Sequence, residues 1–402
     1  MAATPPVLEA LAGRFDGSAF DAPTGRARLR LCVEEAGEWD FVIRRGSERL
    51  ERADGNERPD ARLSADRETW ARVGRDLRGG MNAFRGGRLQ IRDDLHLGVG
   101  FLAATSGSRE PGRLVLARVR TAMGNIAVAR AGDPDAEHVV MLHGLGGTKA
   151  SFLPTVAALA DQYRVHSIDL PGFGDSVKPL RAAYDPRFFA RAVCGFMDAC
   201  GIERAHLIGN SMGGRVALEV GFRYPARVER IVGLAPSLAW LRGRPWTPLV
   251  KALRPELGLL QITPRPVIEE VVRRFVPGGR DGWSAVGVDE FLRAYTTARG
   301  RTAFYAALRN IYLDEPEGND GFWTRLRALE HESLFVWGKK DRLVPIAFAR
   351  HVREALPGAR HLELSCGHVP QLEAPRATHA AIRRFLGGAG ESASRARRAA
   401  SA

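Results

Sequence analysis

The sequence predicts an α/β fold in which a small N-terminal α+β domain precedes a doubly wound, mostly parallel sheet with a helical cap insertion. Three observations carry this prediction. After residue 113, short apolar segments alternate with helical patterns, an order that calls for a parallel sheet covered on both faces. Between about 236 and 330 the alternation stops, as an insertion would make it. The polar, proline-containing segment 106–112 has the composition of a domain boundary.

The first 105 residues combine alternating strand patterns with helical ones. The turn Glu34–Gly37 joins two alternating segments and predicts a hairpin. Asp66 is suited to cap the N-terminus of a helix that reaches Leu77. The other predicted elements are a helix over 5–15, strands over 27–33, 38–43, 61–65 and 86–92, and a closing helix over 94–104.

This N-terminal region, 1–105, resembles the sterol-carrier (SCP2-type) lipid-transfer family. In that family a small α/β layer encloses an apolar tunnel for a fatty-acyl or sterol-like ligand, so the resemblance implies lipid binding. A domain that keeps the shape without the cavity, and serves as an interaction or regulatory module, is the alternative. The matching features are the strand pair 27–33 and 38–43, the strand leading into Asp66–Trp70, the segment Met81–Arg88 and the exit Ile91–Leu95.

The second domain is predicted over 113–386, with its cap at about 236–330. Helical pieces are expected in the cap at 267–275 and 288–310, with tryptophans 240, 246, 283 and 323. Most of these rings are expected to be buried and to hold the cap together, and others to face a pocket. The basic tail 387–402 is expected to be disordered. The predicted strands lie at 114–119, 125–129, 138–142, 164–168, 205–208, 230–234, 333–337 and 361–364.

Composition limits the class of protein. The chain has 402 residues, of which 45% are hydrophobic and 26% charged, as in ordinary globular proteins. It has no run of roughly 18 or more apolar residues, and its N-terminus lacks basic residues ahead of an apolar core. We therefore expect a soluble, cytoplasmic protein.

The net charge of +13, from 59 Lys and Arg against 46 Asp and Glu, raises the question of an acidic partner. The arginines are spread along the chain and form no zinc-finger or RNP-type signature, so no nucleic-acid partner is expected. A diffuse positive field favours weak, peripheral association with anionic membrane surfaces. An arginine-rich composition by itself is the simpler explanation of the charge.

The four cysteines are scattered and form no C-x-x-C pair, so they are expected to be free thiols. Cys366 lies two residues before His368, but no further ligand has suitable spacing for a metal site. We expect neither a metal nor another cofactor.

The segment Leu207–Gly214 ends an apolar run in G-x-S-x-G around Ser211 and opens into a helical pattern. Glycines two residues before and two after the serine allow a sharp strand-to-helix turn that exposes the hydroxyl group. A plain glycine turn would give the same pattern, and the chain contains 44 glycines. The assignment of Ser211 as a nucleophile therefore depends on other residues of the sequence.

A serine nucleophile needs a base to take its proton and an acid group to orient that base. Asp341 follows the strand ending at Trp337, and His368 follows the next strand through Gly367, which gives the chain order serine, acid, histidine. We therefore predict Ser211, Asp341 and His368 as the catalytic residues. A turn aspartate or a surface ion pair remains the alternative for Asp341.

The tetrahedral intermediate of acyl transfer also needs two hydrogen-bond donors for its oxyanion. Met212, directly after the serine, is predicted to supply one backbone N–H. Leu145, in the loop His143-Gly144-Leu145-Gly146-Gly147, is predicted to supply the other. His143 and Gly144 are expected to shape that loop.

Residues 113–386 resemble the α/β-hydrolase superfamily. The resemblance is carried by His143-Gly144 after a strand, the segment Asp169–Ser176, the serine turn, Asp341 and His368. It implies a serine hydrolase that needs no cofactor and acts on a small-molecule, lipid-like carboxylic ester or thioester through an acyl-enzyme on Ser211. The apolar acyl group is suggested by the lipid-carrier resemblance. Two alternatives stay open: hydrolysis of a carbon–carbon bond in a meta-cleavage product, and a non-enzymatic lipid carrier.

Overall fold

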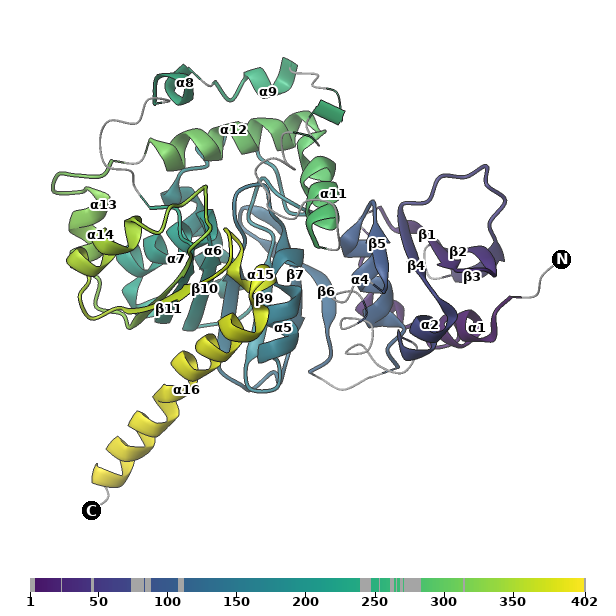
Figure 1. Ribbon diagram of the computed structural model, residues 1–402, viewed down its shortest axis with the longest axis horizontal. Helices are drawn as coiled ribbons and strands as arrows, with labels where there is room; N and C mark the ends of the chain where they lie inside the picture. The colour runs from purple at the N-terminus through teal and green to yellow at the C-terminus, as the bar shows by residue number, and fades with distance from the viewer. Residues whose placement is uncertain are drawn as a thin grey trace.

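The computed structural model contains two β-sheets, one in each half of the molecule (Figure 1). It describes residues 4–400 except 23, 45–46, 74–82, 84–87, 108–111, 239–246, 253, 261–263, 265, 268–269, 271–282 and 314. The predicted α/β fold with a mostly parallel sheet is confirmed. Within the described residues, no helix combines the length and the apolar character needed to cross a lipid bilayer.

The N-terminal unit has a five-stranded sheet in the order β3-β2-β1-β4-β5. β1 pairs parallel with β4, and the other neighbouring strands pair antiparallel. Asp66 accepts a hydrogen bond from the Thr69 N–H at the start of α2, as its expected capping role requires. The elements are α1 (Pro6–Ala12), η1 (Gly17–Ala19), β1 (Arg26–Val33), β2 (Gly37–Arg44), β3 (Ser47–Arg52), β4 (Ala61–Ala65), α2 (Arg67–Val73), β5 (Gln90–Arg92) and α4 (Leu95–Ala104).

Three features of this unit differ from the sequence prediction. β3 was not predicted, because its sequence SERLER lacks a buried apolar face and its charges suit a strand at the sheet edge. The strand predicted over 86–92 is shorter, since β5 begins at Gln90 and 86–87 lie outside the described residues. α1 ends at Ala12 rather than Phe15. The predicted extension of the second helix to Leu77 also lies outside the described residues.

The second sheet has eight strands in the order β13-β12-β11-β10-β8-β9-β7-β6. The six strands from β8 to β13 pair parallel with one another, whereas β7 pairs antiparallel with both β9 and β6. Every strand predicted after residue 113 is present. They are β6 (Val115–Thr121), β7 (Gly124–Ala131), β8 (His138–Leu142), β9 (Arg164–Ile168), β10 (Ala205–Asn210), β11 (Val228–Leu234), β12 (Ser333–Gly338) and β13 (Arg360–Leu364).

Alternate residues of the central strands bury against helices on opposite faces of this sheet. In β8, Val139 and Met141 belong to the apolar core that includes α5 and α16, whereas Val140 and Leu142 belong to the core that includes α6 and α7. This is the consequence of the two-residue period of a strand covered on both faces. The covering helices are α5 (Leu153–Leu159), α6 (Pro186–Ala199), α7 (Met212–Arg223), α14 (Phe348–Ala355), α15 (Pro370–Glu373) and α16 (Pro375–Ala400).

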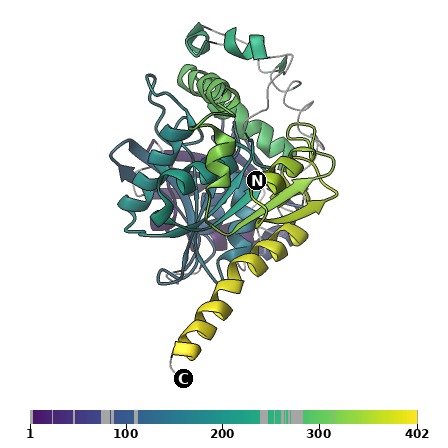
Figure 2. The ribbon, with the colours of Figure 1, turned by 90° about the vertical axis from the view of Figure 1, so that its left-hand side faces the viewer.

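The insertion between β11 and β12 is helical. Most of its helices lie at the upper end of the molecule in both views, whereas the last one lies beside α14 (Figures 1 and 2). The single helix predicted over 288–310 is wrong, because the chain breaks at Thr297, whose side chain caps a new helix at the Gly300 N–H. Most of the helix predicted over 267–275 lies outside the described residues. The same holds for the side chains of Trp240, Trp246 and Trp283. The helices are α8 (Thr247–Ala252), α9 (Leu257–Leu260), α11 (Trp283–Tyr295), α12 (Ala298–Tyr312) and α13 (Phe322–Arg327).

The expectation of a disordered tail is corrected for residues 387–400, and residues 401–402 lie outside the described residues. α16 continues to Ala400 and extends away from the body of the molecule (Figure 2). The tail is rich in alanine and arginine, two strong helix formers, which outweigh its glycines once the helix has begun in the folded domain.

Candidate active site

Ser211 lies in the turn between β10 and α7, with φ of 52° and ψ of −115°. This left-handed backbone conformation is costly for a residue with a side chain, and it is characteristic of functional sites. The turn depends on the flanking glycines. A Cβ at Gly209 would lie 2.2 Å from the carbonyl carbon of Gly213, and one at Gly213 would lie 2.0 Å from the carbonyl oxygen of Leu142. The G-x-S-x-G pattern is therefore a steric requirement of this turn.

His368 and Asp341 form a hydrogen-bonded pair beyond the ends of β13 and β12. The His368 Nδ1–H donates to Asp341 Oδ2 at 2.8 Å. The other carboxylate oxygen, Oδ1, accepts from the backbone N–H groups of Leu343 and Val344 at 2.8 and 2.9 Å. The Asp341 side chain has no exposed surface, and the His368 side chain is 12% exposed. In the neutral imidazole, a proton on Nδ1 leaves Nε2 as the hydrogen-bond acceptor.

Asn210 connects the histidine loop to the serine turn. Its Nδ2 donates to the carbonyl oxygens of Leu234 and His368, each at 3.0 Å. The backbone N–H of Ser211 also donates to the Leu234 oxygen at 3.0 Å. One buried side chain thus brings together the turn after β10, the end of β11 and the loop that carries His368. Nothing in the sequence pattern marks Asn210 as a residue of the site.

The loop carrying Leu145 lies against the serine turn. A Cβ at Gly144 would lie 3.3 Å from the Cβ of Ser211, so this loop and the serine are in close contact. Met212 is the first residue of α7, and its N–H is among those that a helix leaves without an internal partner. These are the positions from which the two predicted oxyanion donors would act.

His143 is bound to the backbone through both ring nitrogens. Nδ1 donates to the Gly144 carbonyl oxygen at 2.7 Å, and Nε2 accepts from the Leu170 N–H at 2.9 Å. Complete burial lowers the pKa of His143, so the ring stays neutral. His143 therefore holds the loop in shape and is not available as a base for Ser211.

Asp169 and Asp175 likewise serve local structure. Asp169 is fully buried and accepts from the Lys149 backbone N–H at 2.6 Å and from Lys149 Nζ at 2.8 Å. Burial opposes ionisation, but the positive charge of Lys149 outweighs it and lowers the pKa of Asp169. Asp169 also accepts from the Asp175 N–H at 2.8 Å, which closes the loop after β9. The loops after β8 and β9 are thus fastened to each other.

Glu373 is a site residue that the sequence analysis missed. Its carboxylate accepts from the backbone N–H of Gly367 at 2.6 Å and from that of Val369 at 2.9 Å. These are the two residues on either side of His368. A glutamate five residues after a histidine carries no distinctive sequence signal, and its role becomes visible only when the loop folds back over α15.

Replacing Glu373 with glutamine is expected to lower kcat for ester hydrolysis about tenfold, because the amide group can accept only one of the two N–H bonds and His368 loses part of its support. KM should change less than kcat. Steady-state kinetics on the variant, beside the Glu354→Gln variant as an exposed control, would test this. Equal kinetics for the two variants would show that Glu373 does not position His368.

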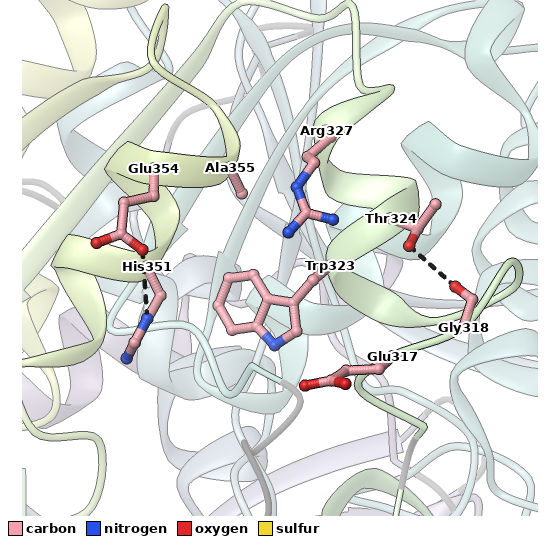
Figure 3. A pocket seen from close by; sticks show the side chains of 8 residues that line it. All are labelled: Glu317, Gly318, Trp323, Thr324, Arg327, His351, Glu354 and Ala355. Atoms are coloured by element: carbon pink, nitrogen blue, oxygen red, sulfur yellow. Dashed lines mark hydrogen bonds and ion pairs between the residues drawn. The ribbon is translucent and has the colours of Figure 1, made fainter.

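A separate hollow of about 540 Å³ lies between α13 and α14 (Figure 3). Trp323 and His351 face it, with His351 Nδ1 3.7 Å from Glu354 Oε2. None of the predicted catalytic residues lines this hollow. Across the parts of the chain that the structure describes, no group of three or more His, Cys, Asp or Glu side chains is arranged to hold a metal ion.

The strand order, the strained serine turn and the Asp–His pair at the carboxyl ends of the strands define an α/β hydrolase. The chain belongs to this family: residues 137–375 match the family model described as alpha/beta hydrolase fold. The N-terminal unit lies outside that match.

Individual relatives differ in what they are named for. A 2-hydroxy-6-oxononadienedioate/2-hydroxy-6-oxononatrienedioate hydrolase of Pseudomonas sp. is 32% identical over 62% of this chain and 87% of its own length. The dihydrolipoyllysine-residue acetyltransferase component of the acetoin cleaving system of Cupriavidus necator is 30% identical over 63% of this chain, which spans only 64% of that protein. The crystal structure of a bacterial membrane phospholipase A has a TM-score of 0.58 and 27% identity, covering 68% of this chain and 86% of that one.

Proposed function

We propose that this protein is a serine hydrolase that cleaves a carboxylic ester or thioester with an apolar acyl group. The observation that carries the proposal is the His368–Asp341 hydrogen bond of 2.8 Å in a loop tied through Asn210 to the strained turn of Ser211. A histidine oriented by a carboxylate, in a loop bonded to the turn of such a serine, has the parts needed for nucleophilic acyl transfer.

In the first step of the proposed mechanism, Ser211 Oγ attacks the acyl carbonyl carbon while His368 Nε2 takes the serine proton. Asp341 stabilises the positive charge that forms on the imidazole ring. The backbone N–H groups of Met212 and Leu145 would bind the oxyanion. His368 then gives its proton to the departing alkoxide or thiolate, which leaves the acyl group on Ser211. A water molecule, deprotonated by His368, hydrolyses that acyl-enzyme and restores the free serine.

The apolar acyl group is proposed from two lines of support. The N-terminal unit resembles lipid-transfer domains, and we propose that it binds a lipid-like ligand. Of the similar proteins, an acetyltransferase component is named for an acetyl group and a phospholipase A for a phospholipid. The relative of Pseudomonas sp. is instead named for a hydrolase of a dienedioate, a carbon–carbon bond substrate of the kind that the alternative reading requires.

A substrate panel tests the proposal. It contains p-nitrophenyl esters from acetyl to palmitoyl, the matching acyl-coenzyme A thioesters and a 2-hydroxy-6-oxo-dienoic acid. We expect kcat/KM to rise with acyl length, by about threefold for each added methylene that is buried, until the site is full. If the dienoic acid has a higher kcat/KM than every ester and thioester, the protein is a carbon–carbon bond hydrolase and the proposal is wrong.

A further inference from the structure

The cap helix α11 contacts two other parts of the chain, the turn between β5 and α4 of the N-terminal unit and the loop after β8. These three parts form a junction. In Figure 1, α11 lies between the second sheet and the end of the N-terminal unit that carries β5. All three parts contribute charged or polar groups to this junction. The family model begins at residue 137, so the turn between β5 and α4 lies outside the matched region.

The first contact joins the N-terminal unit to Asp289 of α11. Arg92 donates from Nε to Asp289 Oδ2 at 2.6 Å and from Nη2 to Oδ1 at 3.2 Å. The Asp289 side chain is only 5% exposed, whereas that of Arg92 is 45% exposed. Bidentate arginine–carboxylate pairs of this kind fix the relative orientation of the two side chains in addition to their charge attraction.

The second contact makes Glu290 a bridge between the N-terminal unit and the loop after β8. Glu290 Oε1 accepts from the backbone N–H of Leu95, in the first turn of α4, at 3.0 Å. Its other oxygen, Oε2, accepts from Thr148 Oγ1, also at 3.0 Å. Glu290 is 4% exposed, so both bonds form where water competes little.

Arg293, one turn further along α11, binds the loop after β9. It donates to Asp175 at 2.7 and 3.3 Å and to Glu290 at 3.2 Å, and it lies 3.5 Å from Asp94 of the N-terminal unit. Asp175 in turn binds Lys149 at 2.9 Å. The charged groups of α11 are therefore fastened to both the N-terminal unit and the loops that surround the proposed active site.

Phe291 of α11, next to Glu290, packs against the loop that carries the predicted oxyanion donor Leu145. A Cβ at Gly146 would lie 2.6 Å from the Phe291 ring, and Gly146 has φ of 74°. Only glycine allows both the close approach and this backbone conformation. Gly146 directly follows Leu145, so a shift of Phe291 would act on the backbone next to that donor.

We propose that the N-terminal unit is a positioning element of the active site. Arg92 and the Leu95 N–H hold Asp289 and Glu290, and this fixes α11 so that Phe291 keeps the loop 143–147 in the conformation that presents the Leu145 N–H. Arg92, Asp289 and Glu290 are thus positioning residues that touch no substrate. The inference rests on the proposed acyl-transfer function of Ser211.

The chain offers a matched control for this proposal. Arg113 and Asp16 form another ion pair between the N-terminal unit and the rest of the chain, with Nη1 2.7 Å from Oδ2. Arg113 also donates from Nη2 to Ser18 Oγ at 2.9 Å, so both of these partners of Arg113 lie in the N-terminal unit. Breaking this pair should weaken the attachment of the N-terminal unit without moving Phe291.

The test compares Arg92→Ala, Arg92→Lys, Arg92→Asp, Asp289→Arg, the charge-swapped double variant and Arg113→Ala in the full chain. The measurements are kcat and KM for p-nitrophenyl butyrate and the thermal midpoint. Arg92→Ala and Arg92→Asp should lower kcat about tenfold while KM stays within about twofold. Arg92→Lys and the double variant should recover most of that loss. Arg113→Ala should leave kcat unchanged.

The inference is overturned if Arg92→Ala and Arg113→Ala have the same kcat, which would make the junction a structural contact only. It is also overturned if Arg92→Lys fails to recover kcat while its thermal midpoint equals that of the wild type. Arg92 is partly exposed, so Arg92→Ala is expected to fold. The comparison of its kcat with that of Arg113→Ala therefore tests the proposal even if Asp289→Arg fails to fold. The Ser211→Ala variant separates the two proposals, since failure of the proposed function would appear as hydrolysis that survives in that variant.

Discussion

Replacing Ser211 with alanine is expected to reduce kcat for ester hydrolysis by on the order of 10⁶-fold, the effect seen when a nucleophile is removed from a triad of this kind. The reason is that no acyl-enzyme can form without Oγ, while the oxyanion donors and the binding site remain. The variant should fold as well as the wild type, because the substitution removes none of the hydrogen bonds made by the backbone of the turn. Steady-state kinetics and a thermal midpoint measure both effects.

Ser365→Ala is the matched control for this variant, since Ser365 is an exposed serine in the segment leading to His368. It should keep full activity. Hydrolysis by Ser211→Ala within about tenfold of the wild type would mean that another nucleophile, or an activated water molecule, does the work.

Replacing Asp341 with asparagine is expected to lower kcat by on the order of 10⁴-fold. The two backbone donors at Oδ1, the N–H groups of Leu343 and Val344, would keep the amide oxygen on their side. The amide NH₂ would then face His368 Nδ1 and force the ring proton onto Nε2. In that tautomer His368 cannot accept the serine proton, so the loss comes from the wrong tautomer and not from misfolding.

The Ser211→Ala, Asp341→Asn double variant provides the control. Because the two residues act as one unit, the double variant should be no less active than Ser211→Ala alone. If Asp341→Asn retains activity within about threefold of the wild type, the acid role belongs to another carboxylate, and the Asp341–His368 bond is structural.

The arrangement of the candidate site could be predicted because it depends on local signals and chain order. Gly209 is required by its contact with Gly213, four residues away, and Gly213 by its contact with Leu142 of the neighbouring strand. Both glycines lie two residues from Ser211, so together they leave a recognisable local pattern in the sequence. Asp341 and His368 each follow an apolar strand, and parallel strands bring their carboxyl ends to the same edge of a sheet.

What could not be predicted depends on contacts between distant residues. The bonds of Arg92 to Asp289 and of Leu95 to Glu290 join positions about two hundred residues apart. In the sequence, Arg92, Asp289 and Glu290 are indistinguishable from ordinary charged surface residues, and Leu95 takes part only through its backbone N–H. Asn210 and Glu373 are ordinary polar residues until the His368 loop is folded beside them. β3 was missed for a different reason, since an edge strand needs no apolar face.

The central claim is that Ser211 forms an acyl-enzyme, and intact-protein mass spectrometry after reaction with a fluorophosphonate or a slowly hydrolysed p-nitrophenyl ester tests it most directly. We predict one added phosphonyl or acyl group per chain, located on the peptide that contains Ser211, and no addition to the Ser211→Ala variant. Modification of another residue, or equal modification of the wild type and Ser211→Ala, would contradict the account.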